Sequence, residues 1–101
     1  MNSKLNQLLT TLLDAKMSLD ERMEAASYLE SYDEPQAEEG LAKVARDQGE
    51  DPDLLDYCGE SLAGIWSRKG VINFALLSQL APPARAIAEA TVRNKRPDLL
   101  N

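Results

Sequence analysis

A pattern of small and aliphatic residues that recurs at the length of a helical hairpin most limits how this chain can fold. The first copy lies in the segment 22–29, RMEAASYL, and the later copies follow at intervals of 33 and 30 residues. Repeats of this length predict a small stack of helix pairs. The three copies are Arg22, Ala25 and Leu29, then Leu55, Cys58 and Leu62, then Arg85, Ala88 and Val92.

Apolar periodicity and local start and stop signals predict six helices. Ser18 with Glu21 has the spacing of a capping box, and Asp33 with Gln36 forms a similar pair. Proline suits a first helical turn, where its missing N–H costs nothing, and glycine suits a helix end. The expected helices are Lys4 to Asp14, one from Leu19, one from Pro35 that ends before Gly49, Asp51 to Lys69, Val71 to Leu80, and Ala84 to Lys95, followed by a tail from Asp98 to Asn101.

The segment from Val71 to Leu80 is almost entirely apolar, so we expect it to be the most buried element. The second helix of each pair also follows the repeat, because adding 33 to Leu41 and Val44 gives Phe74 and Leu77. Two helix faces therefore share one period, which predicts an all-α fold of stacked antiparallel pairs.

At Arg22, Ala25, Ala26 and Leu29 the chain resembles the HEAT and armadillo-like helical repeats. In that family the first helix of a pair carries an Arg and an alanine-rich face that ends in Leu. The copy at Leu55 has lost the Arg, and the repeats here are shorter than usual for the family. The resemblance implies a short HEAT-like solenoid, and it covers most of a single domain, residues 1–101.

Catalytic and metal-binding chemistry is poorly represented in the composition. The 101 residues include no His and a single Cys, so the usual zinc ligands, the usual base for a nucleophile and an internal disulfide are all missing. Cys58 aligns with Ala25 and is expected to be a small core residue. The segment 47–53 is rich in carboxylates but lacks the spacing of a calcium-binding EF-hand loop. We expect neither enzymatic activity nor a metal or cofactor.

The amino-terminal segment has apolar residues at helical spacing, interrupted by Asn, Gln and Thr, so it lacks the unbroken apolar stretch of a signal peptide. No apolar run approaches the roughly 20 residues that a membrane helix needs. These features predict a cytoplasmic protein that does not associate with membranes.

Charge is distributed unevenly along the chain. Residues 20–60 hold 14 acidic and 3 basic side chains, a net charge of −11, whereas residues 61–101 hold 2 acidic and 6 basic side chains, a net charge of +4. About half of this asymmetry follows from local structure, because carboxylates favour helix starts and cations favour helix ends. A surface of this sign repels phosphates, so we do not expect nucleic-acid binding.

Three carboxylates on the helix from Asp51 to Lys69 form a stripe that continues beyond the helix start. Asp53, Asp56 and Glu60 are spaced i, i+3 and i+7, so they share one stripe of the helix, and no basic residue interrupts that stripe. The repulsion among the three carboxylates is unfavourable unless a cation binds near them. Tyr57 beside the stripe is a candidate aromatic anchor, and Tyr28 and Tyr32 are weaker candidates. The expected acidic binding region further includes Glu38, Glu39, Asp47 and Glu50.

Two interpretations of this acidic region stay open at this point: a solvated face, or a surface that binds a basic protein. In size, charge and helical repeat the chain is similar to bacterial immunity proteins, including those of contact-dependent inhibition systems, which bind and block a basic nuclease toxin domain. This similarity implies a small acidic protein-binding module. The alternative is a general helical-repeat adaptor or assembly factor without an inhibitory role.

Overall fold

Helix α4 (Pro52–Lys69) is the element against which most of the chain packs, because α2, α3 and α6 all contact it. The computed structural model describes residues 2–100. No strand occurs within these residues, so the predicted all-α class is confirmed. The other elements are α1 (Ser3–Leu13), α2 (Leu19–Leu29), α3 (Pro35–Ala45), α5 (Phe74–Leu77), α6 (Pro82–Lys95) and the 3-10 turn η1 (Pro97–Leu100).

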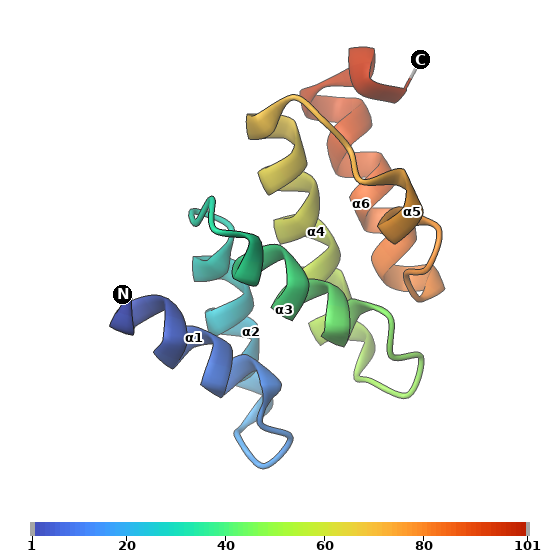
Figure 1. Cartoon of the computed structure of the whole chain (residues 1–101). Helices are drawn as coiled ribbons and strands as arrows, with labels where there is room; N and C mark the ends of the chain where they lie inside the picture. The colour runs from blue at the N-terminus through green and yellow to red at the C-terminus, as the bar shows by residue number, and fades with distance from the viewer. Residues whose placement is uncertain (1, 101) are drawn as a thin grey trace.

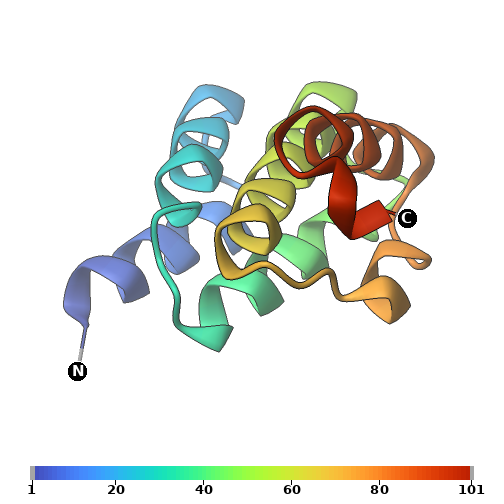
Figure 2. The same ribbon diagram turned by 90° about the horizontal axis from the view of Figure 1, so that it is seen from above.

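The helices lie in two rows. Figure 2 shows α2, α4 and α6 side by side in one row and α1, α3 and α5 in the other. The chain direction alternates between the rows, so α2, α4 and α6 run parallel to one another, upward in Figure 1. Helix α1 packs against α2 and α3, and α3 packs against α4. The expectation of six helices is thus confirmed, while their description as a HEAT-like solenoid stays a prediction.

Local capping groups set two helix starts as the sequence predicts. Ser18 Oγ accepts the N–H of Glu21 at 3.1 Å and donates to Glu21 Oε1 at 2.9 Å, which fixes the start of α2. The Asp51 carboxylate accepts the N–H of Asp53 at 2.9 Å and caps α4. At the other end of α4, Gly70 adopts φ of 76°, the left-handed conformation in which many helices end.

The predicted cap of Asp33 and Gln36 is wrong. Glu34 is the N-cap residue of α3, and it makes no side-chain capping hydrogen bond. The Asp33 carboxylate instead accepts two hydrogen bonds from the Arg68 guanidinium, at 2.8 and 3.1 Å. A charged donor on a neighbouring helix competes well with a backbone N–H, because charge-assisted hydrogen bonds are the stronger ones. Helix α3 therefore starts at Pro35, whose ring favours a first turn.

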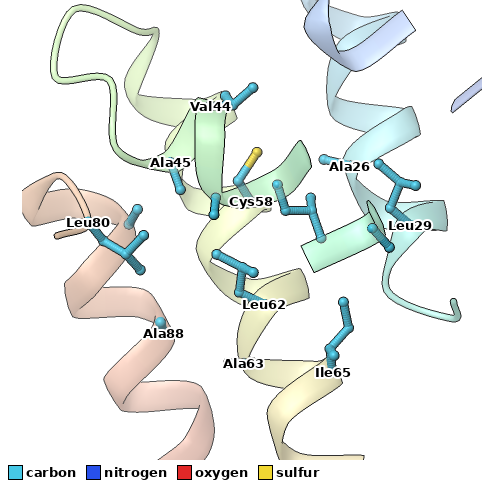
Figure 3. Packing of buried hydrophobic residues seen from close by; sticks show 14 of the residues in the cluster. Ala26, Leu29, Val44, Ala45, Cys58, Leu62, Ala63, Ile65, Leu80 and Ala88 are labelled. Atoms are coloured by element: carbon cyan, nitrogen blue, oxygen red, sulfur yellow. The ribbon is translucent and has the colours of Figure 1, made fainter. Parts of the chain in front are cut away.

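The hydrophobic core runs along α4, between the two rows. All residues from 61 to 67 are buried, and Trp66 and Leu62 are at most 1% exposed. Figure 3 shows Cys58 and Leu62 of α4 among aliphatic side chains of α2 and α3, while Ala88 of α6 lies on another side of α4. Cys58 is fully buried, so its prediction as a small core residue is confirmed.

The segment 71–80 is not the most buried element, and this prediction is wrong. Only Phe74–Leu77 is helical, and the Val71 and Phe74 side chains are 61% and 57% exposed. The Asn73 side chain accepts the N–H of Leu76 at 3.1 Å, and this capping bond starts the helix late. The preceding residues therefore form a connection that leads from α4 to the second row (Figure 2). Apolar composition alone did not show that half of this segment faces solvent.

The 33-residue repeat of the second row holds at one position and fails at the other. Val44 and Leu77 are both 5% exposed, whereas Leu41 is fully buried and its counterpart Phe74 is exposed. In the single turn of α5 the buried residues are Leu76 and Leu77, at its end, whereas Phe74 at its start is exposed.

The carboxy-terminal segment also departs from prediction. Helix α6 begins at Pro82, two residues before the expected Ala84, because two successive prolines fit a first turn in which backbone N–H groups have no helical partner. The predicted tail belongs to the turn η1, where Leu99 and Leu100 pack half-buried against the core. Asn101 lies outside the described residues.

The arginine of the recurring pattern has different roles in the two copies that contain it. Arg22 is buried, donates to the Leu12 carbonyl at 2.9 Å and binds both Glu50 carboxylate oxygens at 3.1 Å. Arg85 is exposed, and its nearest carboxylate is that of Glu89 at 3.7 Å on the same helix. The aliphatic and small residues of all three copies are buried, so the repeat describes packing and does not extend to the arginine.

Candidate functional site

The acidic stripe lies on the exposed side of the first half of α4. Asp53, Asp56 and Glu60 are all exposed. Within residues 2–100, none of their carboxylates makes an ion pair or accepts a hydrogen bond. The structure therefore keeps three like charges together on one helix, and in the described part of the chain none of them is part of an ion pair.

A groove between α4 and α6 brings part of this stripe next to apolar side chains. Asp56, Tyr57 and Glu60 line a hollow of about 260 Å³ together with Ile87 of α6. Glu60 also lines an adjoining hollow of about 360 Å³, whose other lining residues are Ala90, Thr91, Asn94 and Lys95 of α6. We call the two hollows together the α4–α6 groove. Small-molecule sites usually measure about 300–1,000 Å³. The smaller hollow is below this range and the larger one is near its lower limit.

Tyr57 gives the groove an exposed aromatic side chain. It is 42% exposed and shares the smaller hollow with the half-buried Ile87. Large, partly exposed aromatic residues often contribute strongly to protein interfaces, because they lose much water-exposed apolar area at little cost in side-chain entropy. The combination of Tyr57 and Ile87 with carboxylates on the rim is typical of an apolar contact surrounded by charge.

The groove is shallow because α4 and α6 approach each other closely. Gly59 lies on α4 against the backbone of Ala84, and a Cβ atom at Gly59 would come within 2.6 Å of Ile87 Cγ2. On α6 the residues that face α4 are also small, since Ala84 and Ala88 are fully buried. Close approach of the two helices leaves Ile87 in the floor of the groove instead of deep in the core.

Glu38 and Glu39, which the sequence placed in the same acidic region, lie on α3 in the other row and do not line the groove. The Glu38 carboxylate accepts the indole N–H of Trp66 at 2.6 Å, which gives it a structural role. Glu39 is exposed and lines a separate hollow of about 250 Å³ that includes Arg46. The structure therefore separates these two residues from the stripe on α4 (Figure 2).

Asp47 and Glu50 lie in the connection between α3 and α4. Asp47 Oδ1 accepts the N–H of Gly49 at 2.9 Å, an Asx turn that shapes this connection. The Glu50 carboxylate is bound by Arg22 through two hydrogen bonds and its side chain is 19% exposed. Glu50 is thus engaged within the protein, and the residues that the structure brings together are Asp53, Asp56, Tyr57 and Glu60.

The two weaker aromatic candidates lie elsewhere. Tyr28 is 55% exposed, and with the half-buried Tyr32 it lines a hollow of about 450 Å³ between α1 and α2. Lys4 and Glu24 line the same hollow, so opposite charges share its rim. This hollow is separate from the α4–α6 groove and lacks its excess of carboxylates.

Sequence reasoning missed the α6 wall of the groove. Ile87 follows the alanine-rich start of α6 and falls outside the pattern of Ala88 and Val92, so it carried no sign of its role. No local signal marks it, because Ile87 is half-buried against Gly59 of α4, a contact that depends on how the two helices pack. Lys95 lies at a helix end, where a cation is expected, so nothing in the sequence indicates that it also lines the groove.

The one thiol of the chain is chemically protected. Burial raises the pKa of Cys58 from 9.0 to about 12, although the charge of Arg22 lowers it slightly. Because the folded-state pKa is above that of the unfolded chain, this thiol stabilises the fold fully below pH 9, and that contribution is lost as the pH rises towards 12. At pH 8 we expect a thiol-specific reagent to modify Cys58 at once in denaturant, but in buffer only as fast as the protein unfolds. Rapid labelling of the folded protein would contradict this burial.

A scan against protein-family models finds no match, and searches of curated proteins and of solved structures find no similar protein. Within residues 2–100, no group of three or more His, Cys, Asp or Glu side chains is arranged to hold a metal ion. In the same part of the chain, every helix is too short or too polar to cross a membrane.

Proposed function

We propose that this protein is a small protein-binding module that binds a basic protein partner through the α4–α6 groove. The observation that carries the proposal is the set of three unpaired carboxylates, Asp53, Asp56 and Glu60, beside the exposed ring of Tyr57. A cationic partner would relieve the repulsion among the carboxylates, and an apolar partner side chain would cover Tyr57 and Ile87. Electrostatic attraction of this kind speeds association and selects partners of opposite charge.

The proposed partner is a nuclease-type toxin domain, and the proposed role is that of its immunity protein. A nuclease must present a basic surface to hold RNA or DNA, and a stripe of carboxylates competes for such a surface. Net charge of −6 on 101 residues adds a long-range attraction to the contact itself. In this role the protein acts in the cytoplasm, where it would block the toxin, and it needs neither a cofactor nor catalytic activity of its own.

A general adaptor without an inhibitory role is the second candidate, and two exposed apolar side chains in and before α5 favour it. Val71, before α5, and Phe74, its first residue, are more than half exposed, and neither lines the α4–α6 groove. An apolar surface distinct from an acidic one would suit a protein that holds two partners. The two candidates differ in one outcome, since an immunity protein abolishes the activity of its partner and an adaptor need not.

The test uses the carboxy-terminal domain of a large secreted protein encoded beside this gene, provided that domain is basic. We expect the purified protein to inhibit the nuclease activity of that domain at a 1:1 ratio, with affinity that falls steeply as salt rises. The triple variant Asp53→Asn, Asp56→Asn, Glu60→Gln should bind at least about tenfold more weakly, because three charge contacts with the partner are lost.

A matched variant with the same change in charge controls for long-range attraction. Asp20→Asn, Glu24→Gln, Glu39→Gln removes three exposed carboxylates from α2 and α3, outside the groove. We expect it to lower affinity much less than the groove variant does. Equal losses would show that net charge, and not the groove, determines binding, and unchanged inhibition by the groove variant would contradict the proposal.

Chemical denaturation of the groove variant completes this experiment. Relief of the repulsion on α4 offsets the lost interaction of Asp53 with the start of the helix, so the free energy of unfolding should change by less than about 0.5 kcal/mol. A loss of binding without a loss of stability would then report on the contact itself.

A further inference from the structure

The α4–α6 groove has two ends of opposite charge. Asp56 and Ile87 lie at one end, Glu60 lies where the two hollows adjoin, and Lys95 lies at the other end. Because α4 and α6 run parallel, the carboxylates lie along the first half of α4 and Lys95 lies on the last turn of α6 (Figure 1). Lys95 is exposed and makes no ion pair within residues 2–100. A segment in this groove therefore meets negative charge first and positive charge last.

On the basis of the function proposed above, we propose that the groove binds a helical segment of the partner. This segment carries cations at one end, an aliphatic side chain next to them and a carboxylate at the other end. The cations would meet Asp53, Asp56 and Glu60, and the carboxylate would meet Lys95. The charge order along the segment thus fixes the direction in which it lies in the groove.

The spacing of the charges favours a helix over an extended strand. Asp53, Asp56 and Glu60 lie at intervals of about 4.5 and 6 Å along α4, at the rise of 1.5 Å per residue. A second helix alongside places side chains at i, i+3 and i+7 with the same intervals and on one face. In a strand, residues on one face are about 6.6 Å apart, so only some cations could meet carboxylates.

The length of the groove sets the length of the segment. Ile87 and Lys95 are separated by about 12 Å along α6, and Asp53 lies roughly one turn below Tyr57 on α4. A helix of about three turns would reach from Asp53, which precedes the groove on α4, to Lys95 at the end of the groove. A uniformly basic segment of this length would place a cation against Lys95, which is unfavourable for like charges in a partly desolvated contact.

Two synthetic peptides test the charge order. Both are amphipathic helices with Lys at i, i+3 and i+7 and a Leu on the same face. They differ at one position beyond the last Lys, where one carries Gln and the other Glu, and each is made in both sequence directions. In one direction we expect the Glu peptide to bind about threefold more tightly than the Gln peptide despite its lower net positive charge.

Two variants of this protein show whether Lys95 causes that preference. Lys95→Gln should abolish the preference for the Glu peptide, whereas Arg93→Gln, an equal charge change at an exposed position outside both hollows, should keep it. Affinity is measured by isothermal titration calorimetry at low and moderate salt. Tighter binding of the Gln peptide in both directions, or a preference that survives Lys95→Gln, would overturn the charge order.

The failure of this inference is distinguishable from the failure of the proposed function. If the Gln peptide binds the original protein and binds the variant Asp53→Asn, Asp56→Asn, Glu60→Gln more weakly, the acidic groove is a binding site, even if Lys95 does not distinguish between the two peptides. If neither peptide responds to that variant, the groove itself is rejected as the binding surface.

Discussion

Replacement of Arg22 by methionine is expected to lower the free energy of unfolding by about 3 kcal/mol, the largest effect that we predict for a single substitution. The substitution leaves the Glu50 carboxylate without its partner in a position where the two side chains are only 9% and 19% exposed. It also removes the donor to the Leu12 carbonyl at the end of α1. Chemical denaturation at neutral pH measures the loss.

Arg85→Met is the matched control, because Arg85 occupies the equivalent position of the third copy but is exposed. We expect a change within about 0.5 kcal/mol there. The double variant Arg22→Met, Glu50→Met should recover part of the loss, since it removes the unpaired charge together with its partner. Equal effects of Arg22→Met and Arg85→Met would show that the buried ion pair does not stabilise the fold.

Gly59→Ala is expected to destabilise the protein by about 2 kcal/mol, although alanine favours a helix more than glycine does. The added Cβ atom would lie 2.6 Å from Ile87 Cγ2 and 3.0 Å from the Ala84 carbonyl carbon, so α6 must move away from α4. Because backbone atoms are among those contacted, a change of side-chain rotamer cannot relieve the overlap. Thermal and chemical unfolding of the variant measure this effect.

Gly64→Ala on the same helix is the control. The three atoms nearest to a Cβ atom at Gly64 would all belong to the side chain of Glu30, which is flexible and can move aside. We expect this variant to be as stable as the original protein or more stable by up to about 1 kcal/mol, the usual gain from glycine to alanine within a helix. A Gly59→Ala variant as stable as Gly64→Ala would mean that α4 and α6 are not held at close approach.

Local signals account for the parts of the fold that the sequence predicted well. Ser18 and Asp51 act on backbone groups within three residues, so their roles are legible without tertiary structure. Asp33 failed as a predicted cap because its competitor, Arg68, is distant in sequence and near in space. The same holds for Glu50, whose partner Arg22 lies 28 residues earlier.

The segment 71–80 shows the limit of composition as a guide to burial. Its apolar residues cannot all face the core, because a late start at Asn73 leaves only one turn of helix. The candidate site had a similar limit. Spacing on one helix was enough to predict the stripe of Asp53, Asp56 and Glu60, but the opposite wall depends on how α6 packs beside Gly59.

Because α2, α4 and α6 run parallel to one another, the molecule has a permanent electric dipole along these helices. Carboxylates lie in the first turns of α2 and α4, at Asp20, Glu21 and Asp53, and cations lie in the last turns of α4 and α6, at Arg68, Lys69, Arg93 and Lys95. In the field of a highly charged partner, such a molecule experiences a torque as well as an attraction. It would tend to rotate during approach, so that the acidic end leads before any side chain is in contact.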